Sequence, residues 1–280
     1  MQIKVLGPLN ARVAGVSIVP TAAKVRQVLA MLALNAGQVV TARALTEELW
    51  EDAPRSAATT LQTYILQLRR NLGGALDGVS ERRAKDVLVT RHVGYVLDVD
   101  PSCVDATAFE VLTSAGRSAF DLGHYESASR ILTTALDLWR GDALVDITPG
   151  PLLAIEVLRL EEDRLGALEC RIDAELILGR HHGLLTELTA LTARHPMNEN
   201  LHSRYLLALY RSGRQGQAFD AYARIRRNLI EELGVEPSGR LRRLHLDMLN
   251  TDPALDSPHG SVASLHGRVT TSFEGAALGA

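Results

Sequence analysis

Residues 60–72 read "TLQTYILQLRRNL", and this stretch decides how the amino-terminal third of the chain is interpreted. At a helical advance of about 100° per residue, four apolar residues cluster within roughly 60° of one another. They are Leu61, Ile65, Leu68 and Leu72. The segment is therefore predicted to be a helix that buries one apolar face.

The opposite face of this helix carries uncharged polar side chains and arginine. Its residues are Thr59, Thr63, Leu66 and Arg70, flanked by Gln62 and Gln67. In the major groove Gln pairs with adenine, Arg pairs with guanine, and Thr or Leu meets the thymine methyl. No carboxylate, which would repel phosphate, occurs between Ser56 and Asn71. We therefore predict that this face reads DNA; the alternative is a solvated surface helix with two arginines.

The neighbouring segments predict a winged helix-turn-helix. "ARALTEELW" at 42–50, with Thr41 as its N-cap, is expected to be the first helix of the pair, and the helix at 56–72 the second, which enters the groove. "DVLVTRHVGYVLDVD" at 86–100 is expected to form two strands joined by a tight turn from Arg91 to Gly94. Arg91 at the tip of this wing would reach a phosphate or the minor groove; the alternative is an exposed turn residue.

The remaining amino-terminal segments complete a small α+β domain. Short β-branched stretches at 2–7, 9–15 and 16–20 predict strands, and 22–37 predicts a helix that ends at Gly37. Gly73-Gly74 is expected to end the helix at 56–72. Residues 54–95 hold seven basic against three acidic side chains, a local excess that suits a polyanion.

From residue 105 to 250 the chain is predicted to be almost entirely helical and repetitive. Gly123, Gly179 and Gly213 each precede a basic residue at an expected helix–helix turn. The last two lie 34 residues apart, which is the period of tetratricopeptide helix pairs. The first interval is longer, because an insertion of about 22 residues surrounds "WRGDALVDITPGPL" at 139–152. Residues 251–280 are rich in Gly, Ser, Pro and Thr, and are expected to be a flexible tail.

Composition favours a cytoplasmic protein. The apolar run "VLAMLAL" at 28–34 is far shorter than the ~20 residues of a membrane span, and no signal-peptide pattern precedes it. Cys103 and Cys170 are too few for a disulfide framework and have no metal-ligand spacing.

Two longer stretches resemble a known family. "TTLQTYILQLRRNL" with "TRHVGY" resembles the OmpR-type winged helix, and "LALYRSGRQGQAFDAY" with "EELGVEPS" resembles the bacterial transcriptional activator domain. Together, over about residues 1–250, the chain resembles the Streptomyces antibiotic regulatory proteins. The expected fold is mainly α with a small α+β part, a winged helix-turn-helix at 1–100 followed by an all-α tetratricopeptide-like array at 105–250.

The resemblance implies a transcriptional activator that binds direct repeats in the promoters of antibiotic (secondary-metabolite) genes. It implies RNA polymerase holoenzyme as a partner and protomers that bind DNA as a dimer or side by side, in the cytoplasm at the nucleoid. The expected DNA contacts are Arg55, Thr59, Gln62, Thr63, Gln67, Arg69, Arg70, Arg91 and His92. Gln67 stands where the family often carries Arg. No G-x-x-x-x-G-K-[ST] and no receiver domain is recognised, so neither an ATPase nor phosphorylation of a receiver is expected.

Three other interpretations stay open. An enzyme is disfavoured: His181-His182 has no H-E-x-x-H or paired Cys, the acidic run at 161–163 suits a solvated helix, and no G-x-S-x-G occurs. We expect no catalytic residue, metal or cofactor. A tetratricopeptide-like interaction scaffold, or a repressor on the same fold, would also carry these patterns.

Overall fold

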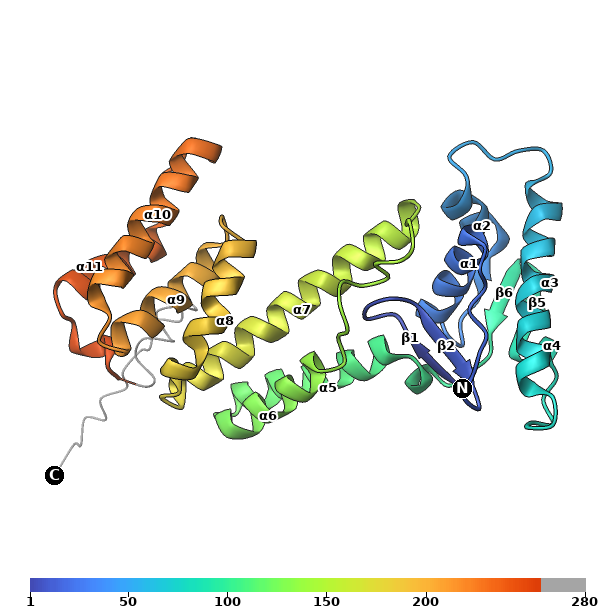
Figure 1. Ribbon diagram of the computed structural model, residues 1–280, viewed down its shortest axis with the longest axis horizontal. Coiled ribbons are helices and arrows are strands. Elements are labelled where there is room, and N and C mark those ends of the chain that lie inside the picture. The colour runs from blue at the N-terminus through green and yellow to red at the C-terminus, as the bar shows by residue number, and fades with distance from the viewer. Residues whose placement is uncertain (258–280) are drawn as a thin grey trace, which may run out of the picture. The chain divides into compact units, whose positions relative to one another are not determined.

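The computed structural model describes residues 1–257 of the 280-residue chain (Figure 1). The predicted amino-terminal strands are confirmed as one antiparallel sheet in the order β1-β2-β3. Their bounds are Gln2–Lys4 for β1, Asn10–Val13 for β2 and Val16–Ser17 for β3. Ile3, Ala11 and Val13 are buried, so one face of this sheet contributes to the core.

Three helices follow, as the apolar spacing predicts: α1 (Ala23–Leu34), α2 (Ala42–Leu49) and α3 (Ala57–Leu76). Thr41 caps α2 as expected, because its Oγ1 accepts from the Ala44 N–H at 3.0 Å. The expectation that Gly73-Gly74 ends the third helix is wrong. Both glycines are helical, because the buried Ala75 and Leu76 continue the apolar face and offset the helical cost of about 1 kcal/mol per glycine.

The predicted wing is confirmed as a hairpin of β5 (Leu88–Arg91) and β6 (Gly94–Leu97), preceded by the short helix α4 (Ala84–Val87). The register pairs Arg91 with Gly94, so His92 and Val93 form a two-residue turn. Sequence patterns missed β4 (Val40–Thr41), which pairs with β6 as the third strand. Gly94 permits this pairing, because a Cβ there would collide with the Val40 carbonyl oxygen.

The rest of the described chain is helical, as expected. Its helices are α5 (Asp105–Asp121), α6 (Tyr125–Leu136), α7 (Pro151–Ile177), α8 (His181–Arg194), α9 (Glu199–Arg211), α10 (Gln215–Leu233) and α11 (Gly239–Leu249), with short 3-10 turns η1 (Pro101–Cys103) and η2 (Pro253–Leu255). The three marker glycines lie in the α5–α6, α7–α8 and α9–α10 turns with φ of 78°, 76° and 73°. Glycine favours these left-handed positions, so the sequence repeat corresponds to three helix pairs.

The insertion between α6 and α7 packs on the amino-terminal sheet region. The Arg140 N–H donates to the Leu6 carbonyl at 2.9 Å, and the Leu144 N–H donates to the carbonyls of Val5 and Gly7 at 3.0 and 2.9 Å. Asp105, at the start of α5, accepts from the Val5 N–H at 2.7 Å. The insertion and the first part of α5, up to Gly116, therefore belong structurally with the winged helix.

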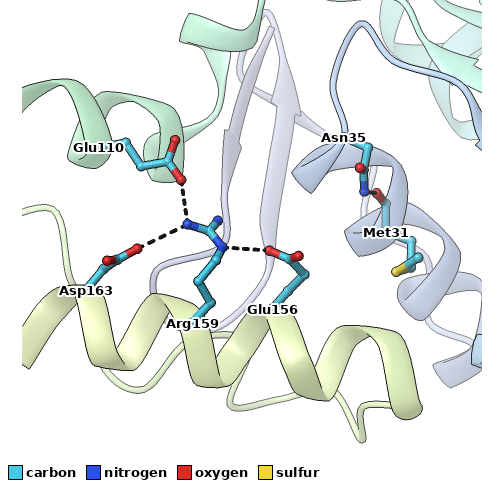
Figure 2. A network of polar contacts seen from close by, with 6 residues as sticks. All are labelled: Met31, Asn35, Glu110, Glu156, Arg159 and Asp163. Carbon is cyan, nitrogen blue, oxygen red and sulfur yellow. Dashed lines mark hydrogen bonds and ion pairs between the residues drawn. The ribbon is translucent and has the colours of Figure 1, made fainter.

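Residues 1–116 and 131–167 form one compact unit, and among the described residues 117–130 and 168–257 form a second. Within the first unit, Arg159 of α7 reaches Glu110 of α5 at 2.8 Å, and also contacts Glu156 and Asp163 on its own helix (Figure 2). The same view shows Asn35 donating to the Met31 carbonyl at the end of α1. The sequence-based limits of 1–100 and 105–250 remain a prediction.

The second unit has its own apolar core, in which Leu188, Leu206 and Ile225 have no exposed area. Seven residues of the expected tail, 251–257, are described. Leu255 among them is 3% exposed in this core, and the Arg211 Nε donates to its carbonyl at 2.7 Å. Residues 258–280 of the expected flexible tail lie outside the described residues. Within residues 1–257, no helix has the length and apolar character needed to cross a membrane.

Candidate nucleic-acid interface

The helix α3 has the two-sided character that its sequence predicts. The four apolar residues that define its predicted buried face are each at most 2% exposed; they are Leu61, Ile65, Leu68 and Leu72. On the other side the side chains of Thr59, Gln62, Thr63 and Arg70 are exposed. Leu66 lies among them and is 50% exposed. This outer face therefore presents hydroxyl, amide, guanidinium and methyl groups to solvent.

Two predicted base contacts differ in accessibility. Thr63 is exposed, and its hydroxyl donates to the Thr59 carbonyl of the preceding turn at 3.1 Å, which leaves its methyl group and an oxygen lone pair accessible. Gln67 is half-buried, at the edge of the outer face. Gln67 follows Thr63 by one helical turn, about 40° further round α3, so a contact by Gln67 would come from the edge of this same outer face.

The two adjacent arginines have different roles in the fold. Arg69 donates from Nε and Nη2 to the Leu88 carbonyl at 3.0 and 2.7 Å, and from Nη2 to Thr90 Oγ1 at 2.8 Å. Arg69 therefore attaches α3 to the first wing strand, and its expected contact with DNA stays a prediction. Arg70 is exposed and has no hydrogen bond or ion pair within residues 1–257.

The wing places its own polar residues at the tip. Arg91 is exposed at the end of β5, His92 is exposed in the hairpin turn itself, and Arg55 is exposed in the loop between α2 and α3. Arg69 connects α3 to the wing through the Leu88 backbone and the Thr90 side chain, which lie 19 and 21 residues further along the chain. The strand that carries Arg91 is therefore fixed relative to the helix that carries Arg70.

An open groove of about 680 Å³ runs between α2 and α3 beside the outer face. Arg43, Trp50, Gln62 and Tyr95 are among its lining residues. Arg43 is exposed and was missed as a candidate, because it lies on the first helix and outside the quoted motif. Trp50 is half-buried in this groove, with the Lys24 ammonium 4.8 Å from its ring centroid.

The candidates for other chemistry are placed as ordinary structural residues. The His181 and His182 rings lie 4.7 Å apart, and partial burial lowers the pKa of His181. Within the described chain no three His, Cys, Asp or Glu side chains gather as metal ligands. Both cysteines are free, and burial raises the pKa of the Cys170 thiol to about 12, which disfavours a reactive thiolate.

The chain matches two protein families in succession. Residues 17–97 match the family described as transcriptional regulatory protein, C terminal, and residues 104–249 match the bacterial transcriptional activator domain. The first match covers most of the winged helix described above, and the second covers the helices α5 to α11.

Individual relatives agree with these matches. The regulatory protein DnrI of Streptomyces peucetius is 54% identical over 257 residues, which is 91% of this chain and 94% of DnrI. AfsR of Streptomyces griseus is 37% identical over 92% of this chain, but the match spans only 25% of AfsR. A solved structure of Mycobacterium tuberculosis EmbR, in complex with a low-affinity phosphopeptide, is similar with a TM-score of 0.85 and 34% identity. That similarity covers 95% of this chain and 69% of the EmbR chain.

Proposed function

This chain belongs to the Streptomyces antibiotic regulatory protein family of transcriptional regulators, and we propose that it activates promoters of antibiotic biosynthetic genes by binding direct repeats. In this proposal the outer face of α3 enters the major groove, and the wing tip with Arg91 and His92 contacts the adjacent backbone or minor groove. The family also fits the expectation that the chain is not an enzyme.

The observation that carries the proposal is the composition of the outer face of α3. It exposes Thr59, Gln62, Thr63 and Arg70, and no acidic residue occurs anywhere along α3. These groups match the donors, acceptors and methyl groups of base-pair edges, and Arg70 also suits a phosphate. The buried leucines behind this face keep the helix in place without using any of its polar groups.

Direct repeats require protomers that bind side by side in the same orientation. Their recognition helices would enter successive major grooves on one side of the duplex, about 10–11 base pairs apart. We further propose that the bound protomers recruit RNA polymerase holoenzyme, and that the protein acts in the cytoplasm at the nucleoid. Both follow from the family and from the proposed activator role.

The test is a mobility shift with purified full-length protein on a duplex that it selects from a random pool. We expect two repeats to be bound cooperatively, and an insertion of about five base pairs between them, half a helical turn, to abolish the cooperativity. A shift only at low salt without preference for a repeat would support the interaction-scaffold alternative. In vitro transcription from the same site separates an activator from a repressor, since a repressor lowers transcript yield.

A further inference from the structure

The helix α7 begins without a cap of its own. The first N–H groups of a helix lack intrahelical partners, and an N-cap side chain usually accepts from one or more of them. Here the N-cap position is Gly150, which has no side chain, and the first helical residue is Pro151. The N–H groups of Leu152 and Leu153 therefore need an acceptor from elsewhere in the chain.

Glu48 of α2 supplies that acceptor from about a hundred residues away. Its Oε2 accepts from the Leu152 and Leu153 N–H groups, both at 2.9 Å, and its Oε1 accepts from the Gly150 N–H at 2.6 Å. Glu48 is 2% exposed and forms no ion pair with a described residue. Its negative charge is thus stabilised by three N–H donors and by the positive end of the α7 dipole.

The close approach of the two elements excludes a local alternative. A Cβ at position 150 would collide with the backbone carbonyl oxygen of Glu48 and would lie 2.8 Å from its side-chain carboxyl carbon. Ser, Thr, Asp or Asn at position 150 could therefore cap α7 only if α7 moved away from α2. The glycine and the distant glutamate together make a cap that exists only while α2 and α7 stay in contact.

The position of Glu48 connects this cap to the candidate interface. Glu48 lies on the first helix of the helix-turn-helix, between the buried Leu45 and Leu49. Two residues later Trp50 lines the groove that Gln62 of α3 and Pro151 of α7 also line. The helix α7 continues past Ala167, where the residues of the first compact unit end, to Ile177.

We propose that Glu48 is a positioning residue for DNA binding: its carboxylate fixes α2, and through α2 the recognition helix α3, to the start of α7. The inference rests on the proposed DNA-binding function. DNA that holds α2 and α3 in their bound orientation then stabilises the cap, and an intact cap strengthens DNA binding by the same factor, because coupling between two sites is reciprocal.

The test measures the coupling from both ends in the full-length protein. Glu48→Gln keeps the shape of the side chain but replaces one acceptor oxygen with an NH₂ group that opposes an N–H donor. We expect faster amide exchange at Leu152 and Leu153, and binding to a pool-selected duplex that is weaker by roughly fivefold or more. In the wild-type protein the same duplex should slow exchange at these two amides.

Glu161→Gln is the matched control. Glu161 also accepts a backbone N–H within the first unit, from Ala143 at 2.8 Å, but it lies on α7 and not on the helix-turn-helix. We expect this variant to bind DNA as the wild type does. Gly150→Ala is the second variant, and it should weaken DNA binding without altering any residue of the helix-turn-helix, even if Glu48→Gln fails to fold.

The outcomes separate the two proposals. Faster exchange in Glu48→Gln with unchanged DNA affinity, and no effect of DNA on exchange at Leu152 and Leu153, overturns the positioning role and leaves the proposed function intact. A wild-type protein that selects no duplex overturns the proposed function and this inference with it. Weakened binding in both Glu48→Gln and Gly150→Ala, with the control unchanged, supports the coupling.

Discussion

Arg70 on α3 and Arg204 on α9 carry the same guanidinium group in opposite surroundings. Arg70 is exposed, with its donors unused by the residues that the structure describes. Arg204 is 4% exposed, and its Nε and Nη2 donate to the two carboxylate oxygens of Asp173 at 2.8 and 2.6 Å. A third donor of Arg204 reaches the Asn200 carbonyl at 3.1 Å. Arg70 is therefore available to bind an anion, whereas the donors of Arg204 stabilise the second compact unit, called the helical unit below.

The largest effect is expected where the buried pair is broken. Arg204→Ala leaves the fully buried Asp173 carboxylate without its bidentate partner, and should lower the free energy of unfolding by about 3–5 kcal/mol. Urea unfolding followed by far-ultraviolet circular dichroism measures this loss. The double substitution Arg204→Met with Asp173→Leu removes both charges and should retain most of the stability. If Arg204→Ala lowers the free energy of unfolding by less than about 1 kcal/mol, the Arg204–Asp173 pair contributes no more than an exposed salt bridge.

The next effect is a pH dependence of the helical unit. Burial lowers the pKa of the His202 imidazole to about 4. The positive charge of Arg224 lowers the pKa further, and the negative charge of Glu199 raises it in part. The folded state then holds a neutral ring that the unfolded chain protonates near its ordinary pKa of about 6.5. The contribution of His202 to the free energy of unfolding is therefore fully present above pH 6.5. It decreases by about 3 kcal/mol as the pH falls from there to 4.

Urea unfolding at pH 7 and at pH 5 tests the histidine effect. His202→Leu should lose less stability than the wild type between these two pH values, because the ring that the unfolded chain protonates is gone. His195→Gln replaces an exposed histidine of the same unit and serves as the control. If the wild type and His202→Leu lose equal stability, other groups are responsible for the acid sensitivity.

A smaller and more selective effect is expected at Gln67. If its amide makes a bidentate base contact, Gln67→Ala should cost about 1–3 kcal/mol of binding free energy on the selected repeat only. Equilibrium binding to the selected duplex and to a scrambled duplex gives the comparison. Since Gln67 is half-buried, the substitution can also change stability. The free energy of unfolding of the Gln67→Ala variant should therefore be measured together with its affinity for DNA. Equal losses on both duplexes would deny the residue a role in base recognition.

The smallest effect is expected at single phosphate contacts. Arg70→Ala and Arg91→Ala should each reduce the slope of log K against log salt by roughly 0.9, with stability within about 0.5 kcal/mol of the wild type. Arg227→Ala, which removes an exposed arginine from α10, is the control and should leave the slope unchanged. If the slope is unchanged in Arg70→Ala, Arg70 does not contact a phosphate. The proposed difference in role between Arg70 and Arg204 would then be wrong.

The parts of this protein that sequence predicted correctly depend on local spacing. The period of Leu61, Ile65, Leu68 and Leu72 gave the buried face of α3, and the αL preference of Gly123, Gly179 and Gly213 marked the turns of the helix pairs. Thr41 capped the helix that follows it. In each case the residues that define the feature lie within one or two turns of the chain, so a one-dimensional pattern contains the physical cause.

The errors arise where distant residues compete with local preference. Gly73-Gly74 stayed helical because Ala75 and Leu76 pack into the core. Val40–Thr41 became a strand because β6 offered it a free edge. The hydrogen bonds that Arg69 donates to the wing strand could not be predicted for the same reason, because Leu88 lies 19 residues further along the chain. Neighbouring side chains on one helix differ in direction by about 100°, and only the fold determines which of them meets another element.

Sequence by itself determined the family, the order of the elements and the face of α3 that stays free of carboxylates, since all three are properties of residue type and spacing. Tertiary structure alone decided which of the two adjacent arginines bonds to the wing, which compact unit contains the insertion, and that Glu48 caps α7 in place of a local side chain. Those choices depend on hydrogen bonds between residues 19 to more than a hundred positions apart. Such bonds form only after the chain has brought both partners together, so no local pattern contains them.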